Sequence, residues 1–107
     1  MILHIGNDIE LEYKFTFRSD LIYENIMNES FKGDTEQSWI VMFYSTYLAL
    51  SNNFDMTLED FIEKLDEKPE SLYEFIAYYS KVMTNQMNLI PKDKEQDSKK
   101  KVKKQTK

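Results

Sequence analysis

The segment from Trp39 to Leu50 constrains the fold of this chain most strongly, because it is apolar around almost its whole circumference. A helix of this kind is buried at the centre of a domain. Asp34, with Gln37 three residues later, resembles a capping box that would open such a helix. We therefore predict a central helix over residues 34–51. A buried strand is the competing interpretation, since the segment is rich in β-branched residues, but its length favours a helix.

A hairpin is predicted at the N-terminus. The apolar stretch Ile2–Ile5 leads into Gly6-Asn7-Asp8, a triplet of residue types that tolerate positive φ angles and form turns. Apolar and polar residues then alternate over residues 9–17, which is the period of a strand with one buried face. A two-stranded hairpin is marginally stable alone, so we expect its apolar face to cover the helices.

A first helix is predicted directly after the hairpin. Ser19 or Asp20 can serve as its N-cap, and it should end near Glu29. The side chains predicted to face the core are those of Leu21, Ile22, Ile26 and Met27.

Two more helices follow the central one in our prediction. Thr57 can cap the first of them, with Asp60 at its third position, and Pro69 suits the first position of a last helix that runs to Pro91. The predicted fold is therefore mainly α (α+β): an N-terminal β-hairpin followed by about four packed helices. We predict one domain over residues 1–91.

The charge of the chain is divided unevenly. Residues 1–91 carry six Lys or Arg against sixteen Asp or Glu, a net charge of −10, and hold every aromatic residue. Residues 92–107 carry eight Lys against three acidic residues, a net charge of +5, and Val102 is their only aliphatic residue. Such a segment cannot bury enough surface to offset its ordering entropy, so we predict a disordered basic tail. Its lysines allow three interpretations: contact with nucleic acid or acidic protein, solubility, or a slippery sequence in the message.

The residue types argue against catalysis. There is no cysteine, which removes a thiol nucleophile and a thiolate zinc site, and two glycines are too few for a phosphate-binding loop. The lone histidine, His4, has no nucleophile or second ligand near it, so we interpret it as structural. Glu59, Glu63 and Glu67 share a helical face, which we interpret as solvated, since the glycine of a calcium loop is missing. We predict no catalytic residue, metal site or cofactor.

The chain is expected to be soluble and intracellular. Its first residues lack the basic and apolar regions of a secretory signal. Its longest apolar stretch, within residues 39–50, is too short to span a bilayer.

Tyrosine and methionine are more abundant than a core of this size requires, at seven and six residues. One interpretation is that the tyrosines lie at the core edge, with their rings buried and their hydroxyls in water. The other is a recognition surface, because Tyr, Trp and Met are enriched at interface centres. On the second interpretation, the predicted partner-binding residues are Trp39, Phe43, Tyr44, Tyr47, Phe54, Met56, Tyr78, Tyr79, Met83 and Met87.

The order of these features resembles a known family. A strand, the Gly6-Asn7-Asp8 turn and the alternating IELEYKF segment (residues 9–15) precede an acidic, aromatic-rich helical body, and a lysine-rich tail follows. Residues 1 to about 90 resemble the tail assembly chaperones of siphophages that infect Gram-positive hosts, most closely those of lactococcal phages. The resemblance implies a protein that binds apolar helical segments of the tape measure protein and keeps them soluble until the tail tube polymerises. It also implies self-association into a ring or spiral, residence in the host cytoplasm and absence from the mature virion.

The physical properties of the chain are compatible with such a chaperone. An adaptable apolar surface suits helix binding, and a charge of −10 on the body would keep the complex soluble. The runner-up is an acidic protein that mimics DNA and inhibits a nucleic-acid-binding host protein. Lys64, Lys68 and Lys81 lie among the carboxylates and weigh against it. An enzyme is the third hypothesis. We expect no contact with membrane or nucleic acid.

Overall fold

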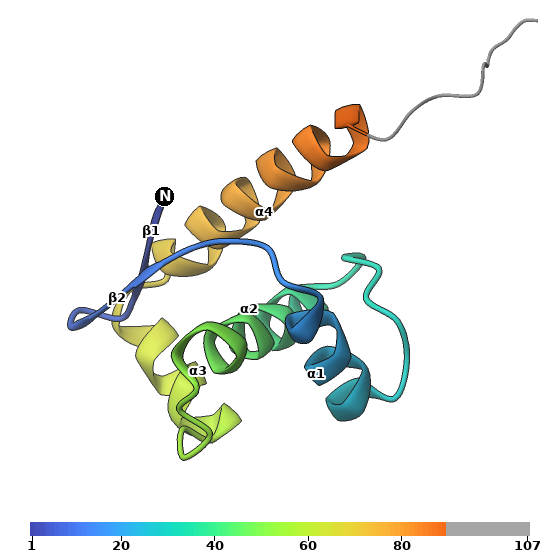
Figure 1. Cartoon of the computed structure of the whole chain (residues 1–107). Coiled ribbons are helices and arrows are strands. Elements are labelled where there is room, and N and C mark those ends of the chain that lie inside the picture. The colour runs from blue at the N-terminus through green and yellow to red at the C-terminus, as the bar shows by residue number, and fades with distance from the viewer. Residues whose placement is uncertain (90–107) are drawn as a thin grey trace, which may run out of the picture.

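The computed structural model describes residues 1–89, with side chains through residue 85, and contains a two-stranded hairpin followed by four helices (Figure 1). The strands are β1 (Ile2–Ile5) and β2 (Ile9–Glu12), and the helices are α1 (Phe17–Met27), α2 (Glu36–Ser51), α3 (Leu58–Glu67) and α4 (Glu70–Leu89). The predicted fold class is confirmed. The predicted disordered tail, residues 92–107, lies outside the described residues.

The central position predicted for α2 is confirmed by its burial. Every residue from Val41 to Leu48 is buried. The hydroxyls of Ser45 and Thr46 donate to the carbonyl oxygens of Val41 and Met42, at 2.8 and 2.9 Å. These bonds satisfy polar groups whose burial would otherwise cost stability.

Threonine residues begin α2 and α3. The predicted cap of α3 is confirmed, because the hydroxyl of Thr57 accepts the N–H of the residue three positions later. The predicted cap of α2, Asp34 with Gln37, is wrong by one residue. Thr35 caps α2 instead, and its hydroxyl accepts the Ser38 N–H at 3.0 Å while the Ser38 hydroxyl accepts the Thr35 N–H at 3.3 Å. This reciprocal pair is a complete capping box.

Strand β2 is shorter than the alternation predicted. It ends at Glu12 and does not reach Phe17. The pairing with β1 ends at this point: Ile2, the first residue of β1, pairs with Glu12, and beyond that pair the N–H of Tyr13 donates to the carbonyl oxygen of Met1 at 2.8 Å.

Helix α1 begins earlier than predicted. Thr16 is its N-cap, and the Thr16 hydroxyl accepts the N–H of Ser19 at 3.2 Å. The predicted cap at Ser19 or Asp20 is therefore wrong, because both residues already lie inside the first turn.

The inward face of α1 also differs from the prediction. Tyr23 is its most buried apolar side chain, and Ile22 and Met27 are half-buried. Leu21 and Ile26, which were predicted to face the core, are 62% and 41% exposed. Leu21 and Ile26 would be buried only if the helix face that carries Leu21 packed against α2. Instead, α1 packs on α2 through the face centred on Tyr23.

The hairpin is fastened to α3 and α4 by polar contacts. The backbone N–H of His4 donates to Oε1 of Glu74 at 2.9 Å, and its ring Nδ1 lies 3.0 Å from the same oxygen. At the hairpin turn, Nζ of Lys64 lies 3.0 Å from a carboxylate oxygen of Asp8. The inward side chains of β1 are fully buried. The strands therefore cover the helices, as expected for a hairpin too small to stand alone.

Stacked aromatic rings join the helices at the centre of the core. Phe43 of α2 and Phe75 of α4 are stacked, with ring centroids 4.5 Å apart and an interplanar angle of 3°. Phe61 of α3 meets Phe43 edge-on at 5.1 Å, and Tyr13 meets Phe75 edge-on at 5.9 Å. One group of rings thus links three helices and the end of the hairpin.

Replacing Phe75 by alanine should therefore destabilise the whole domain. We expect Phe75→Ala to lower the free energy of unfolding by about 3–5 kcal/mol, since it leaves a cavity among buried rings. Urea denaturation followed by circular dichroism measures this change. Phe54→Ala is the matched control, because Phe54 is 56% exposed and should change stability by less than about 0.5 kcal/mol. Equal effects of the two substitutions would contradict the assignment of the core.

Candidate partner-binding surface

Three of the predicted partner-binding residues belong to the core. Phe43, Tyr44 and Tyr47 are 0%, 9% and 5% exposed. The Tyr44 hydroxyl donates to the carbonyl oxygen of Met56 at 2.6 Å, and the Asn53 side-chain amide donates to the Tyr47 hydroxyl at 3.0 Å. These tyrosines thus hold the loop between α2 and α3. Their rings are not available to a partner in this conformation, so we remove all three from the candidate surface.

Trp39 and Tyr79 are half-buried and hold the connection between α1 and α2. The Trp39 indole N–H donates to the carbonyl oxygen of Gly33 at 3.1 Å. The rings of Trp39 and Tyr79 meet edge-on at 5.3 Å, and Phe31 meets Trp39 at 4.9 Å. Gly33 has a φ of +69°, and a Cβ there would lie 3.1 Å from the Trp39 ring. The rings of Phe31, Trp39 and Tyr79 are therefore partly buried because they fix the connection between α1 and α2.

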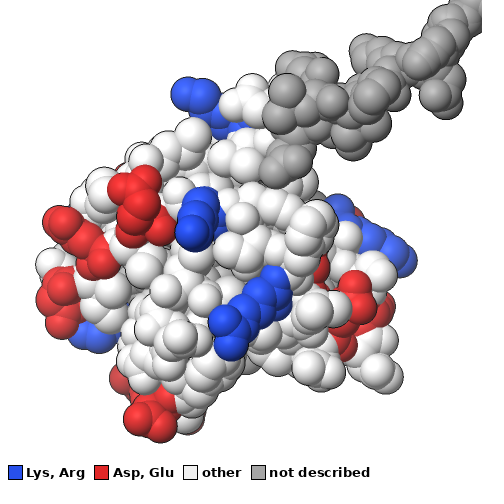
Figure 2. All heavy atoms as spheres, in the orientation of Figure 1, with Lys and Arg blue, Asp and Glu red and all other residues white. Residues whose placement is uncertain are grey.

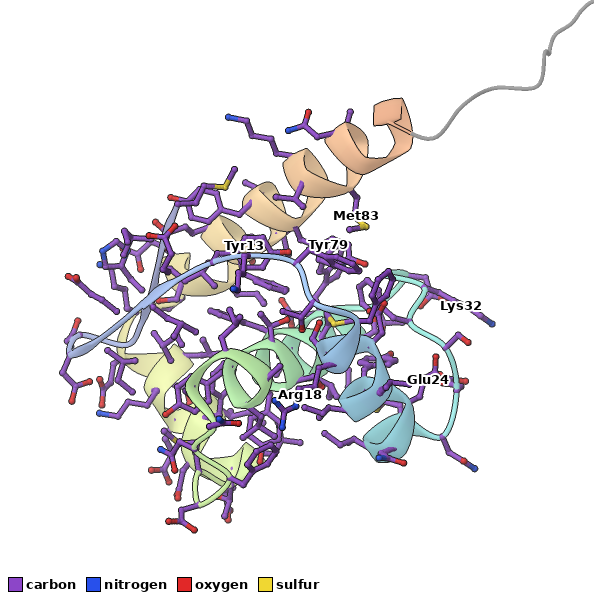
Figure 3. All side chains as sticks on the ribbon, in the orientation of Figure 1. Tyr13, Arg18, Glu24, Lys32, Tyr79 and Met83 are labelled. Carbon is purple, nitrogen blue, oxygen red and sulfur yellow. The ribbon has the colours of Figure 1, made fainter. Side chains whose placement is uncertain are left out.

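The other predicted residues are scattered. Phe54 is exposed and Met56 half-buried in the α2–α3 loop, whereas Tyr78 and Met83 are half-buried on α4. Figure 3 shows Met83 and Tyr79 on the side of α4 that faces α1. The side chain of Met87 lies outside the described side chains. The structure does not bring the ten predicted residues together into one surface.

An uncovered apolar patch lies instead at the start of α1. Phe17 is 76% exposed and Leu21, one turn later, is 62% exposed. The ring of Phe15, which is half-buried, meets Phe17 edge-on with centroids 5.1 Å apart. We call Phe15, Phe17 and Leu21 the α1 patch. Because these exposed apolar side chains are adjacent, we treat the α1 patch as a candidate interaction surface.

The sequence prediction missed this patch because it assigned Phe17 to a strand and Leu21 to the core. The signal was present in the sequence. Thr16 followed by Ser19 is an N-cap pattern, and it places Phe17 and Leu21 one turn apart on the same side of a helix. Ser19 and Tyr23 share the opposite, buried side.

Acidic and basic side chains are distributed differently over one face of the body. Figure 2 shows one face on which carboxylates gather toward the edges, whereas basic side chains lie near its middle as well as at its edges. Arg18 is exposed at the start of α1, within this face (Figure 3). The surface is suited to an apolar partner held in solution by the surrounding charge.

Tyr13, Asp20 and Tyr79 interact electrostatically, and the pKa of each is raised. Burial, the neighbouring Tyr79 and the charge of Asp20 together raise the pKa of Tyr13 well above its usual value. Burial and Asp20 raise the pKa of Tyr79. The pKa of Asp20 is itself raised, first by burial and then by the charge of Glu24. The arrangement therefore favours the protonated form of both phenols.

The sole histidine of the chain, His4, lies among carboxylates. His4 lies between Glu74 and Glu10, with ring-to-carboxylate distances of 3.0 and 3.8 Å. Glu74 contacts both the ring and the backbone of His4, which fits a structural latch. Among residues 1–89, no three side chains of His, Cys, Asp or Glu are grouped so that they could hold a metal ion.

Comparison with known proteins gives no match: neither a protein-family profile, nor a curated protein, nor a solved structure resembles the chain closely enough to identify it. Within residues 1–89, the helices are too short or too polar to cross a membrane.

The raised pKa of Asp20 predicts a pH-dependent stability. In the unfolded chain the carboxyl titrates near 3.8. Because the folded state favours the protonated form, the resulting stabilisation is present below that pH and is lost as the pH rises through the higher folded-state pKa. Asp20→Asn removes this titration. We therefore expect the variant to gain stability relative to the wild type as the pH rises from about 3 to 7. Urea denaturation across this range measures the difference, and a constant or falling difference would contradict the prediction.

Proposed function

We propose that this chain is a non-catalytic chaperone of phage tail assembly that binds apolar helical segments of the tape measure protein and keeps them soluble. The observation that carries the proposal is the α1 patch (Phe15, Phe17 and Leu21), which leaves two large apolar side chains mostly exposed on an acidic body. The family resemblance of the hairpin and helical body supplies the identity of the partner.

The α1 patch suits the apolar side of an amphipathic helix. Such helices bind through anchors spaced three or four residues apart, and Phe17 and Leu21 present that same spacing. Burying a large apolar side chain fully contributes about 1.5–3 kcal/mol. Two such contacts give weak, reversible binding, which a chaperone needs because its client must be released to the tail tube.

The charge of the body supports the second half of this role. Residues 1–91 carry six basic against sixteen acidic residues. A complex that covers an apolar client with such bodies would carry a large net charge and resist aggregation. The proposal further includes self-association into a ring or spiral around the client, residence in the host cytoplasm, and absence from the mature virion.

The test is co-expression of the chain with tape measure fragments, followed by purification on a tag attached to the chain. We expect the wild type to retain at least one fragment. Phe17→Ser with Leu21→Ser should reduce retention roughly tenfold or more, because most of the apolar contact is lost. Both side chains are exposed, so stability should change by only about 0.5 kcal/mol per site.

Phe54→Ser provides the matched control. Phe54 is also more than half exposed, but it belongs to a different segment, the α2–α3 loop. It should leave retention near the wild-type level. If the wild type retains no fragment, the proposed function is wrong. If Phe54→Ser reduces retention as much as the double substitution does, the α1 patch is not the binding surface.

A further inference from the structure

A second surface, formed by α2, α3 and α4, has the features of an anchor site. It is a groove of about 150 Å³ between the first turn of α2, the second half of α3 and the start of α4. Its apolar lining comes from Ile40, Leu65 and Leu72. Ile62 and Tyr73 lie at the opening and are 37% and 63% exposed. An apolar cavity of about this volume accommodates a benzene-sized group, which is the size of one large side chain.

Two carboxylates line the same groove. Glu36 and Asp66 are both exposed there, and neither makes a salt bridge within the described part of the chain. The neighbouring Lys64 is already engaged, 3.0 Å from Asp8 and 3.6 Å from Glu67. The lining therefore combines an apolar interior with negative charge and no basic residue.

The position of Asp66 adds to the negative potential. It lies in the last turn of α3, where the carbonyl ends of the helix already carry partial negative charge. A carboxylate is unfavourable at that end of a helix, and a cation is favourable. The first turns of α2 and α4, which also border the groove, carry the opposite partial charge. The attraction for a cation held beside an apolar group therefore comes from the two carboxylates and not from the helix ends.

We propose that this groove binds a partner segment through one bulky aliphatic or aromatic side chain that is followed, one helical turn away, by Lys or Arg. The anchor fills the apolar interior, and the cation pairs with Glu36 and Asp66. The inference rests on the proposed function for the identity of the partner. It adds the chemistry of the client: segments of the tape measure protein in which an apolar anchor lies beside a basic residue.

Two other occupants fit the groove less well. A second copy of the chain would bring a body in which sixteen acidic residues outweigh six basic ones, so it offers few cations to pair with Glu36 and Asp66 in this groove. The chain's own residues 92–107 supply lysines but only one aliphatic side chain, Val102. A client with larger apolar anchors matches the groove better than either.

The test uses a synthetic, fluorescein-labelled amphipathic peptide with Leu anchors each followed by Lys four positions later, and measures its binding to the full chain by anisotropy. Glu36→Gln with Asp66→Asn should weaken binding roughly 3- to 10-fold at low salt, since exposed ion pairs contribute modestly. Ile62→Ser with Tyr73→Ser should weaken it roughly tenfold, through lost apolar contact. A peptide with Ser in place of each Leu should not bind.

The matched control is Glu29→Gln with Asp55→Asn. It removes the same charge from two exposed carboxylates that do not line the groove. Affinity within twofold of the wild type supports the proposal. If the control pair and the Glu36/Asp66 pair weaken peptide binding equally, the attraction is diffuse and the proposal is overturned. Normal peptide binding by the groove variants would also overturn it. The circular dichroism spectrum and urea midpoint of each variant establish that it is folded.

The same experiments separate this inference from the proposed function and from the other occupants. If wild type and groove variants retain tape measure fragments equally, the function stands and the groove assignment falls. If the peptide binds the groove but no tape measure fragment is retained, the groove stands and the function falls.

If the groove substitutions alter sedimentation but not peptide binding, a second copy occupies the groove. If glutamine at the six lysine positions from 99 to 107 tightens peptide binding, the chain's own tail occupies it. Either of these last two results overturns the proposal.

Discussion

The stacked rings of Phe43 and Phe75 are the contact on which the other elements of this protein depend. They lie 4.5 Å apart and join the buried central helix α2 to the long helix α4. Phe61 brings α3 to the same point, and Tyr13 brings in the chain as it leaves the hairpin. A domain of this size has one modest core. Concentrating aromatic rings there allows a two-stranded hairpin and three outer helices to share it.

This use of aromatic residues determines which part of the surface can bind a partner. Tyr44 and Tyr47 hold the α2–α3 loop by hydrogen bonds, and Trp39 holds the connection before α2. Their abundance, which in the sequence suggested a recognition surface, is largely explained by the core. The apolar side chains left uncovered lie elsewhere: among the described residues, Phe17, Tyr73 and Leu21 are the most exposed of them, and two of these three belong to α1.

Much of the architecture could be predicted because the signals were local. The all-round apolar character of residues 39–50 identified the central helix, and Thr57 identified the start of α3. The wrong predictions concern features that tertiary contacts determine, namely the end of β2 and the inward face of α1. The end of β2 depends on how far it pairs with β1, which alternation within one strand does not reveal. The inward face of α1 depends on Tyr23 packing on α2, so a count of apolar residues placed Leu21 on the wrong side.

The candidate sites likewise depend on tertiary contacts that a local sequence pattern does not reveal. The groove near Glu36 and Asp66 draws its lining from three helices, and no short stretch of sequence contains it. The functional proposal combines that geometry and the α1 patch with a family resemblance, and its central claim is that the chain keeps an apolar client in solution. The most direct measurement is the fraction of a purified tape measure fragment that stays in the supernatant after centrifugation, as the chain is titrated in. The account predicts that this fraction rises with added chain and saturates at a fixed molar ratio. A fragment that pellets equally at every ratio would contradict it.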